Sequence, residues 1–206
     1  MKFLPSFAAL LGASLLAGCG NIQTVKSFST AYQEPSDGER ARVRIVSDGM
    51  VRAVPKSACV DWRVPNAGVM VSSKKGFADQ NNRSLNMPGE PHRLKSEGST
   101  VVSEFYVPAN EPLTFAYLSN GHTNNGKQVQ CRVNKTFTPQ AGKDYEARFV
   151  VLKSQDDKAF SLFNTSANNS CLSLITTLTA DGMPDVTPAN LVKPSDAALC
   201  HATDIL

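Results

Sequence analysis

The sequence predicts an all-β protein whose strands form an antiparallel β-sandwich of the immunoglobulin-like or transthyretin-like kind. The first observation is a series of about nine short apolar or alternating segments, each of strand length. The second is that Gly, Pro, Asn and Asp gather between these segments, where tight turns are expected. The third is that no long stretch repeats its apolar residues with helical spacing.

The first three strands lie close together in the sequence. Residues 40–46 alternate between polar and apolar side chains, as a half-buried strand does. The turn-forming residues 47–49 follow, and residues 50–54 form a second apolar segment that ends at a proline. This order predicts a β-hairpin. The apolar run at residues 67–71 predicts a third strand.

A long segment without periodicity, residues 72–99, comes next. Loops of this length are uncommon in compact domains and are usually functional or mobile. The segment is therefore a candidate for a loop that forms or covers a site. Beyond it, strand patterns bounded by proline or glycine turns return at residues 100–107, 113–118, 128–133, 145–152, 159–163 and 171–176.

A proline-rich tail follows the last predicted strand. Proline has no N–H to donate to a sheet, so its repeated use argues against further central strands. The sequence therefore predicts a sandwich domain over residues 38–180 and a C-terminal tail over residues 181–206.

The first 18 residues have the order of a secretory signal peptide. Lys2 supplies a basic start, and a mainly apolar run of 14 residues, 3–16, follows it. A membrane-spanning helix needs about 20 such residues, so the run predicts a cleaved signal in place of a lasting span.

Residues 16–19, Leu-Ala-Gly-Cys, resemble the lipobox of bacterial lipoproteins. The resemblance implies cleavage before Cys19, a diacylglyceryl thioether on its sulfur and an acyl chain on the new amino end. Because Gly20 stands where an aspartate would signal retention, it also implies export to the outer membrane, facing the periplasm. We therefore expect a membrane anchor at Cys19, and residues 19–37, which lack periodicity, are predicted to form the lipidated end and a flexible tether.

The five cysteines become an even set of four once Cys19 is assigned to the lipid. In an oxidising envelope compartment such a set predicts two disulfides. Successive separations of 72, 40 and 29 residues do not fit the close spacing of zinc or redox sites. Four cysteines allow three pairings. Neighbouring strands favour Cys131–Cys171, which leaves Cys59–Cys200 to tie the tail to the domain.

Charge and motifs narrow the classes of function. Without residues 1–18 the chain carries 20 Lys and Arg against 18 Asp and Glu, a net charge of +2. A net positive charge this small argues against a nucleic-acid partner. His92, His122 and His201 show no metal-ligand spacing, and no nucleophile motif accompanies them. We therefore expect no enzyme activity, no cofactor and no metal.

Two features are candidates for binding. Arg40, Arg42 and Arg44 alternate along one strand, and Arg52 lies on the expected partner strand. Such a face can contact an anionic envelope polymer. The favoured alternative is a solvated face that discourages edge-to-edge aggregation. Trp62 is either an exposed recognition ring or, as favoured here, a core residue near a disulfide.

These observations together predict a lipid-anchored cell-envelope protein that acts as a binding, scaffold or assembly-accessory module. One alternative is an accessory lipoprotein of a secretion apparatus. Another is an envelope hydrolase whose site gathers distant residues, such as His92 or His122 with a carboxylate and a hydroxyl.

Overall fold

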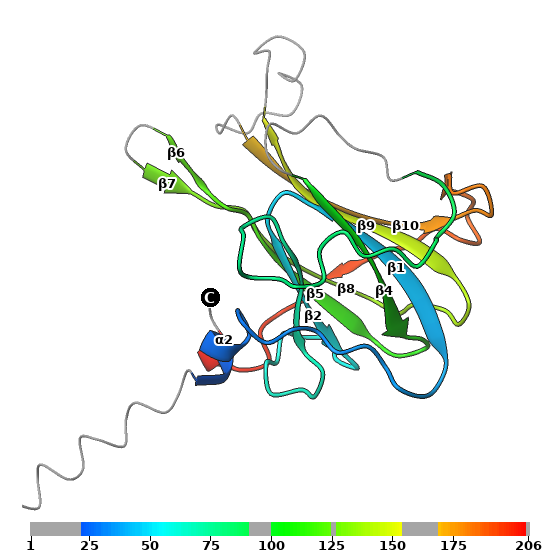
Figure 1. Cartoon of the computed structure of the whole chain (residues 1–206), viewed down its shortest axis with the longest axis horizontal. Coiled ribbons are helices and arrows are strands. Elements are labelled where there is room, and N and C mark those ends of the chain that lie inside the picture. Colours follow the sequence, from blue (N-terminus) through cyan, green and yellow to red (C-terminus); the bar gives the residue numbers. More distant parts are fainter. Residues whose placement is uncertain (1–21, 91–99, 125–126, 154–168, 205–206) are drawn as a thin grey trace, which may run out of the picture.

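The computed structural model describes residues 22–90, 100–124, 127–153 and 169–204 and confirms the all-β sandwich (Figure 1). Two five-stranded sheets pack against each other, and a separate two-stranded sheet projects from them. The strand patterns in the sequence therefore identify the architecture correctly.

The first sheet is built around β1 (Arg40–Ser47). β1 pairs with β4 (Val101–Pro108) in antiparallel fashion and with β9 (Asp144–Lys153) in parallel fashion. β10 (Asn169–Leu178) continues the sheet beyond β9, and the short β11 (Pro184–Asp185) lies at its edge. The alternating pattern that predicted β1 therefore belongs to an interior strand.

The second sheet is antiparallel throughout its described pairings and has the order β12-β8-β5-β2-β3. Its strands are β2 (Met50–Pro55), β3 (Gly68–Ser72), β5 (Leu113–Leu118), β8 (Arg132–Phe137) and β12 (Ser195–Asp196).

The strand expected at residues 128–133 is divided between two elements. β7 (Lys127–Val129) pairs with β6 (His122–Asn124) in the projecting two-stranded sheet. The division occurs at Cys131, whose backbone N–H donates to Ser119 Oγ at 2.9 Å, before β8 begins. The strand expected over residues 159–163 lies outside the described residues.

The connection between β1 and β2 crosses from one sheet to the other, so the hairpin expected here is wrong. The Asp48 carboxylate accepts hydrogen bonds from the Tyr117 hydroxyl at 2.5 Å and from the Val151 N–H at 2.8 Å. An added Cβ on Gly49 would stand 2.3 Å from the Leu118 carbonyl oxygen, so the turn requires glycine. The groups that hold the crossing are 69 and 103 positions away from Asp48, beyond any local turn signal.

Aromatic side chains fill the space between the inner faces of the sheets. The rings of Phe115 and Phe149 meet edge to face with centroids 5.6 Å apart, and Tyr117 stacks on Phe149 at 5.7 Å. These three residues are fully buried. Their large apolar area makes this the main source of sandwich stability.

A smaller apolar cluster covers the outer face of the second sheet. Val60 and Trp62 lie on the segment that follows β2 and pack on Val54 and Ala116. Trp62, the single tryptophan of the chain, is 5% exposed. The expectation that Trp62 has a core role is therefore confirmed.

The chain after residue 21 is part of the fold, so the flexible tether expected over residues 19–37 is wrong for its described part. The segment opens with the short helix α2 (Ile22–Lys26), and Tyr32 is fully buried in the main core. The chain passes so close to β3 that an added Cβ on Gly68 would stand 2.3 Å from the Thr30 carbonyl oxygen. These are contacts with residues far along the chain, which local periodicity does not indicate.

The long segment over residues 72–99 is described as far as residue 90, and its residues 80–87 lie against β4 of the first sheet. The Glu104 carboxylate on β4 accepts hydrogen bonds from the N–H groups of Leu85 at 2.5 Å and Met87 at 3.1 Å. The Glu104 N–H in turn donates to the Arg83 carbonyl oxygen at 3.0 Å. The segment therefore covers the outer face and the edge of β4.

Both favoured disulfides are present in the structure. Cys131–Cys171 joins the residue immediately before β8 to β10 and so links the two sheets. Cys59–Cys200 ties the C-terminal tail to the segment after β2. Beyond this predicted tie, the tail also adds β12 to the edge of β8.

Candidate functional site

The N-terminal helix, one loop and the C-terminal end meet on one side of the sandwich. We call this region, α2 with residues 57–64 and 197–204, the attachment face. Figure 1 shows α2 beside the C-terminal end of the chain, where the helical turn η2 (Ala202–Asp204) lies. Thr24 Oγ1 donates to the Thr203 carbonyl oxygen at 2.8 Å. This face begins three positions after Cys19, which itself lies outside the described residues.

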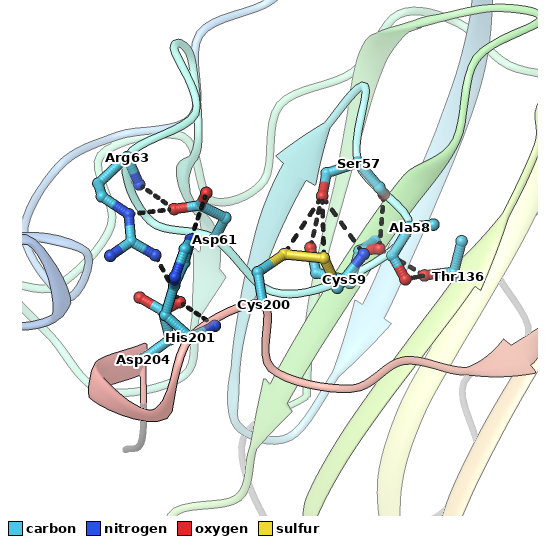
Figure 2. The surroundings of a disulfide bond; sticks show 10 residues. Ser57, Ala58, Cys59, Asp61, Arg63, Thr136, Cys200, His201 and Asp204 are labelled. Carbon is cyan, nitrogen blue, oxygen red and sulfur yellow. Dashed lines mark hydrogen bonds and ion pairs between the residues drawn. A yellow bond between two sulfur atoms is a disulfide. The ribbon is translucent and has the colours of Figure 1, made fainter.

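The Cys59–Cys200 disulfide lies at the inner end of the attachment face (Figure 2). Ser57 Oγ donates to the Cys59 carbonyl oxygen at 2.7 Å and accepts from the Cys59 N–H at 3.3 Å. Thr136 Oγ1 of β8 donates to the Ala58 carbonyl oxygen at 3.2 Å. The loop that carries Cys59 is therefore held to the sheet independently of the disulfide.

A charge network closes the outer end of the attachment face (Figure 2). Arg63 donates from Nε to Asp61 Oδ1 at 2.7 Å and from Nη2 to Asp204 Oδ2 at 2.8 Å. The His201 N–H donates to the same Asp204 oxygen at 3.1 Å. Burial opposes ionisation of Asp61, but the Arg63 N–H and guanidinium outweigh it and hold the pKa of Asp61 below its usual value.

The ligand atoms of Asp61, His201 and Asp204 lie within 4.8 Å of one another, which is a spacing suited to a metal ion. However, Arg63 donates to both carboxylates, so a positive charge already occupies their common side. His201 Nε2 lies 3.6 Å from Asp61 Oδ2, beyond hydrogen-bond distance. We therefore assign no metal here and regard the cluster as an ion-pair network that secures the tail.

A buried cation joins the N-terminal segment to the second sheet. The guanidinium of Arg52 on β2 lies between two rings, 4.2 Å from the Phe28 centroid and 4.1 Å from the Trp62 centroid. Its Nη1 donates to Ser27 Oγ at 2.6 Å. Aromatic faces attract a cation, and more strongly where water is excluded. Arg52 therefore holds residues 27 and 28 against the body.

The Arg52 side chain is unusual because it is fully buried and forms no ion pair with a described carboxylate. Its Nε and Nη2 have no hydrogen-bond partner among the described residues. Burial, assisted by the charge of Arg132, lowers the pKa of Arg52 to about 9, so the group stays protonated at neutral pH. Burying such a charge is costly unless the two rings and Ser27 compensate.

The four arginines singled out from the sequence do not form one exposed face, so that expectation is wrong. Arg44 is 1% exposed and Arg52 is 0% exposed. Arg42 forms two hydrogen bonds of 2.7 Å with the Asp144 carboxylate. Arg40 is the exposed member of the set. The favoured alternative, a solvated face, is wrong for the same reason.

The physical reason lies in strand register. The alternation does place Arg40, Arg42 and Arg44 on one face of β1, but Arg44 stands directly opposite Glu104 on β4 and Glu146 on β9. The Arg44 guanidinium pairs with the first at 2.9 Å and with the second at 3.4 Å. Opposite charges across a sheet stabilise the pairing of strands. The carboxylates lie 60 and 102 positions away, so sequence spacing does not reveal them.

A hollow of about 490 Å³ lies beside Arg44 and is bordered by the 84–90 segment. Arg44 Nη2 donates to the carbonyl oxygens of Met87, Pro88 and Gly89, while Nε and Nη1 donate to the two glutamates. Every nitrogen of the guanidinium is therefore already used within the fold. The positive charge of Arg44 is therefore not free to bind a ligand in the hollow.

Ser27 and Phe28, which adjoin the attachment face, are the residues that sequence patterns missed. Neither lies in a periodic segment, because the chain here is mostly irregular and these two residues gain their contacts from Arg52 on β2. The one local signal is the pair of aromatics Phe28 and Tyr32 in a stretch otherwise read as a tether. Of the histidines considered for a hydrolase, His92 and the side chain of His122 lie outside the described residues.

The chain matches no protein-family model and no curated protein. Within the described ranges, none of the helices is long and apolar enough to cross a membrane.

Proposed function

We propose that this is a lipid-anchored cell-envelope protein, attached through Cys19 and acting as a binding, scaffold or assembly-accessory module. The anchor holds it to the outer membrane on the periplasmic side, as the lipobox resemblance and Gly20 imply. The sandwich then presents its surfaces to an envelope polymer or to a protein partner.

The distribution of the cysteines carries this proposal. The chain has five cysteines, and the two disulfides use four of them. Cys19 is thereby left without a cysteine partner in its own chain, at the one position that fits a lipobox. Paired cysteines persist in oxidising compartments such as the periplasm. The four cysteines in disulfides and the remaining Cys19 thus both support a location in the periplasm.

The attachment of the N-terminal segment to the body supports a positioned module. Thr24, Ser27 and Tyr32 each contact residues far along the chain, through Thr203, Arg52 and the main core respectively. A domain on a long free linker samples many orientations. Here the described chain is part of the fold from Ile22 onward, which suits a module that meets its partner in a set orientation.

The proposal is tested by expressing the full chain with Cys19→Ser. Because the thioether requires sulfur, the variant is expected to leave the outer-membrane fraction and to accumulate as precursor or as unanchored protein. Ser29→Ala, an exposed change in the same segment, is the control and is expected to fractionate as wild type does. Equal outer-membrane recovery of Cys19→Ser and wild type would contradict the proposal.

The module role needs a separate experiment. Cross-linking of envelopes that contain the lipidated protein, followed by gentle solubilisation, is expected to recover a stoichiometric envelope protein or a polymer fragment. Recovery of the protein alone over a range of cross-linker lengths would contradict a binding or scaffold role while leaving the anchor intact.

A further inference from the structure

We propose that the outward side of α2 lies directly on the bilayer, with Ile22 and Val25 in the lipid interface. The inference rests on lipid attachment at Cys19, as proposed above, and goes beyond it by assigning the surface of the folded body that meets the membrane. The occupant of this surface is the headgroup region of the same leaflet that holds the acyl chains.

The first argument is the length of chain between the anchor and the fold. Three peptide links separate Cys19 from Ile22, and consecutive Cα atoms are 3.8 Å apart, so the Cα atoms of the two residues cannot be more than about 11 Å apart. The polar layer of a bilayer is roughly 5–8 Å thick on each side. With the acylated residue in the interface, α2 therefore begins within or immediately above the headgroups.

The second argument is that α2 is fixed to the body. Thr24 Oγ1 donates to the Thr203 carbonyl oxygen at 2.8 Å, and Ser27 Oγ donates to the Thr24 carbonyl oxygen at 2.6 Å. Ser27 Oγ also accepts the bond from buried Arg52. The short link to the membrane therefore positions the whole attachment face, and the helix does not act as a separate linker.

The third argument is the composition of the exposed side of the helix. Ile22 is 50% exposed and Val25 is 68% exposed, whereas Thr24 is buried against the tail. Residues three apart share a helix face, so the two apolar side chains project together. Lys26, exposed next to them, favours anionic headgroups. Apolar residues with an adjacent basic residue are typical of a helix that lies in a membrane interface.

Photo-cross-linking to lipid tests this arrangement with the full lipidated chain. The protein is reconstituted in vesicles of phosphatidylethanolamine and phosphatidylglycerol that contain a phospholipid with a diazirine near the glycerol. After irradiation, adducts are mapped by mass spectrometry. We expect adducts on Ile22 and Val25 and several-fold fewer on Val186, an equally apolar and 71% exposed residue of the tail.

Two matched double variants test whether the adducts depend on the apolar side chains of α2. Ile22→Asp with Val25→Asp is expected to reduce adducts at residues 22–26 several-fold, whereas Met183→Asp with Val186→Asp is expected to leave them unchanged. All four side chains are exposed, so neither variant disturbs the core. Similar labelling of Val186 and Val25 would overturn the inference, because the lipid would then contact α2 no more than it contacts the tail. No labelling at α2 in protein that carries the lipid would also overturn it and would indicate that a protein partner or solvent covers α2.

The same spectra separate this failure from failure of the proposed function. The mass of the N-terminal peptide reports whether Cys19 carries lipid. A peptide without lipid would overturn the anchor, and with it the basis of this inference. A lipidated peptide with an unlabelled α2 would overturn the membrane-facing arrangement alone.

Discussion

The Arg52 guanidinium lies 4.1 Å from the ring centroid of Trp62, and both side chains are buried on the outer face of the second sheet. The Phe28 ring centroid lies 4.2 Å from the same guanidinium. A charge within an apolar cluster thus joins the segment that follows the lipobox to the sandwich. Together with the Thr24–Thr203 hydrogen bond and buried Tyr32, this contact holds the N-terminal segment against the body.

Replacing Arg52 separates the contribution of packing from that of charge. Arg52→Met keeps a long side chain between the rings and removes a buried charge, so its free energy of unfolding is expected to stay within about 1 kcal/mol of wild type or to rise. Arg52→Ala leaves a cavity and is expected to lower that free energy by about 2–4 kcal/mol. Urea unfolding measures both, with Arg40→Met as the exposed control. Equal losses in the two Arg52 variants would show that the cation itself is required.

The Cys59–Cys200 disulfide closes a loop with a sequence separation of 141. In the chain-entropy model, removing it with Cys59→Ala and Cys200→Ala is expected to destabilise the protein by about 2–5 kcal/mol. Cys131–Cys171, with a separation of 40, is expected to contribute about 1 kcal/mol less. Denaturation midpoints and slopes provide the comparison. A larger loss from the Cys131–Cys171 double variant would contradict this ranking.

Arg63 is expected to matter more than an ordinary surface arginine. Its partner Asp204 has a side chain only 2% exposed, so Arg63→Gln leaves a buried carboxylate without its cation. We expect a loss of about 1–3 kcal/mol and faster hydrogen exchange at residues 201–204. Lys56→Gln, which breaks an exposed pair with Glu111, is the control and is expected to cost less than about 1 kcal/mol. Unchanged exchange in the tail of Arg63→Gln would contradict the role of this network.

Glu104 gives a prediction about pH. Burial favours its neutral form, but the N–H groups of Leu85 and Met87 and the Arg44 guanidinium outweigh burial and hold the pKa of Glu104 below its ordinary 4.5. A carboxyl with a lowered folded-state pKa stabilises the fold above pH 4.5, and this contribution is lost as pH falls through the lowered value. Glu104→Gln is therefore expected to lose less stability than wild type between about pH 5 and pH 3. Urea unfolding at a series of pH values measures the two slopes, and an equal slope in Glu104→Gln and wild type would refute the prediction.

Strand positions were predictable because each strand has its own local pattern. The segments 40–46, 113–118 and 145–152 lie within or match β1, β5 and β9 to within one or two residues. The favoured pairing of Cys131 with Cys171 was predictable for a related reason, since Cys131 lies within one predicted strand segment and Cys171 begins another. A period of two identifies a strand and its buried face without information about its neighbours.

The sheet to which a strand belongs was not predictable in the same way. Residues 47–49 carry ordinary turn signals, yet Tyr117 and Val151 draw Asp48 into a crossing between sheets. The arginine face was misjudged because the carboxylates that neutralise Arg44 lie on β4 and β9. Tyr32 in the core and Phe28 on Arg52 are likewise contacts across the chain. Contacts between residues distant in the sequence decide these features, and local sequence patterns do not indicate which distant residues will meet.

The mass of the mature N-terminal peptide tests the central claim most directly. Protein isolated from envelopes is digested, and its first peptide is measured without removing lipid. The account predicts a peptide that begins at Cys19 and carries a diacylglyceryl group on sulfur and an acyl chain on the amino group. An unmodified Cys19, or a mature chain that begins at another residue, would contradict it.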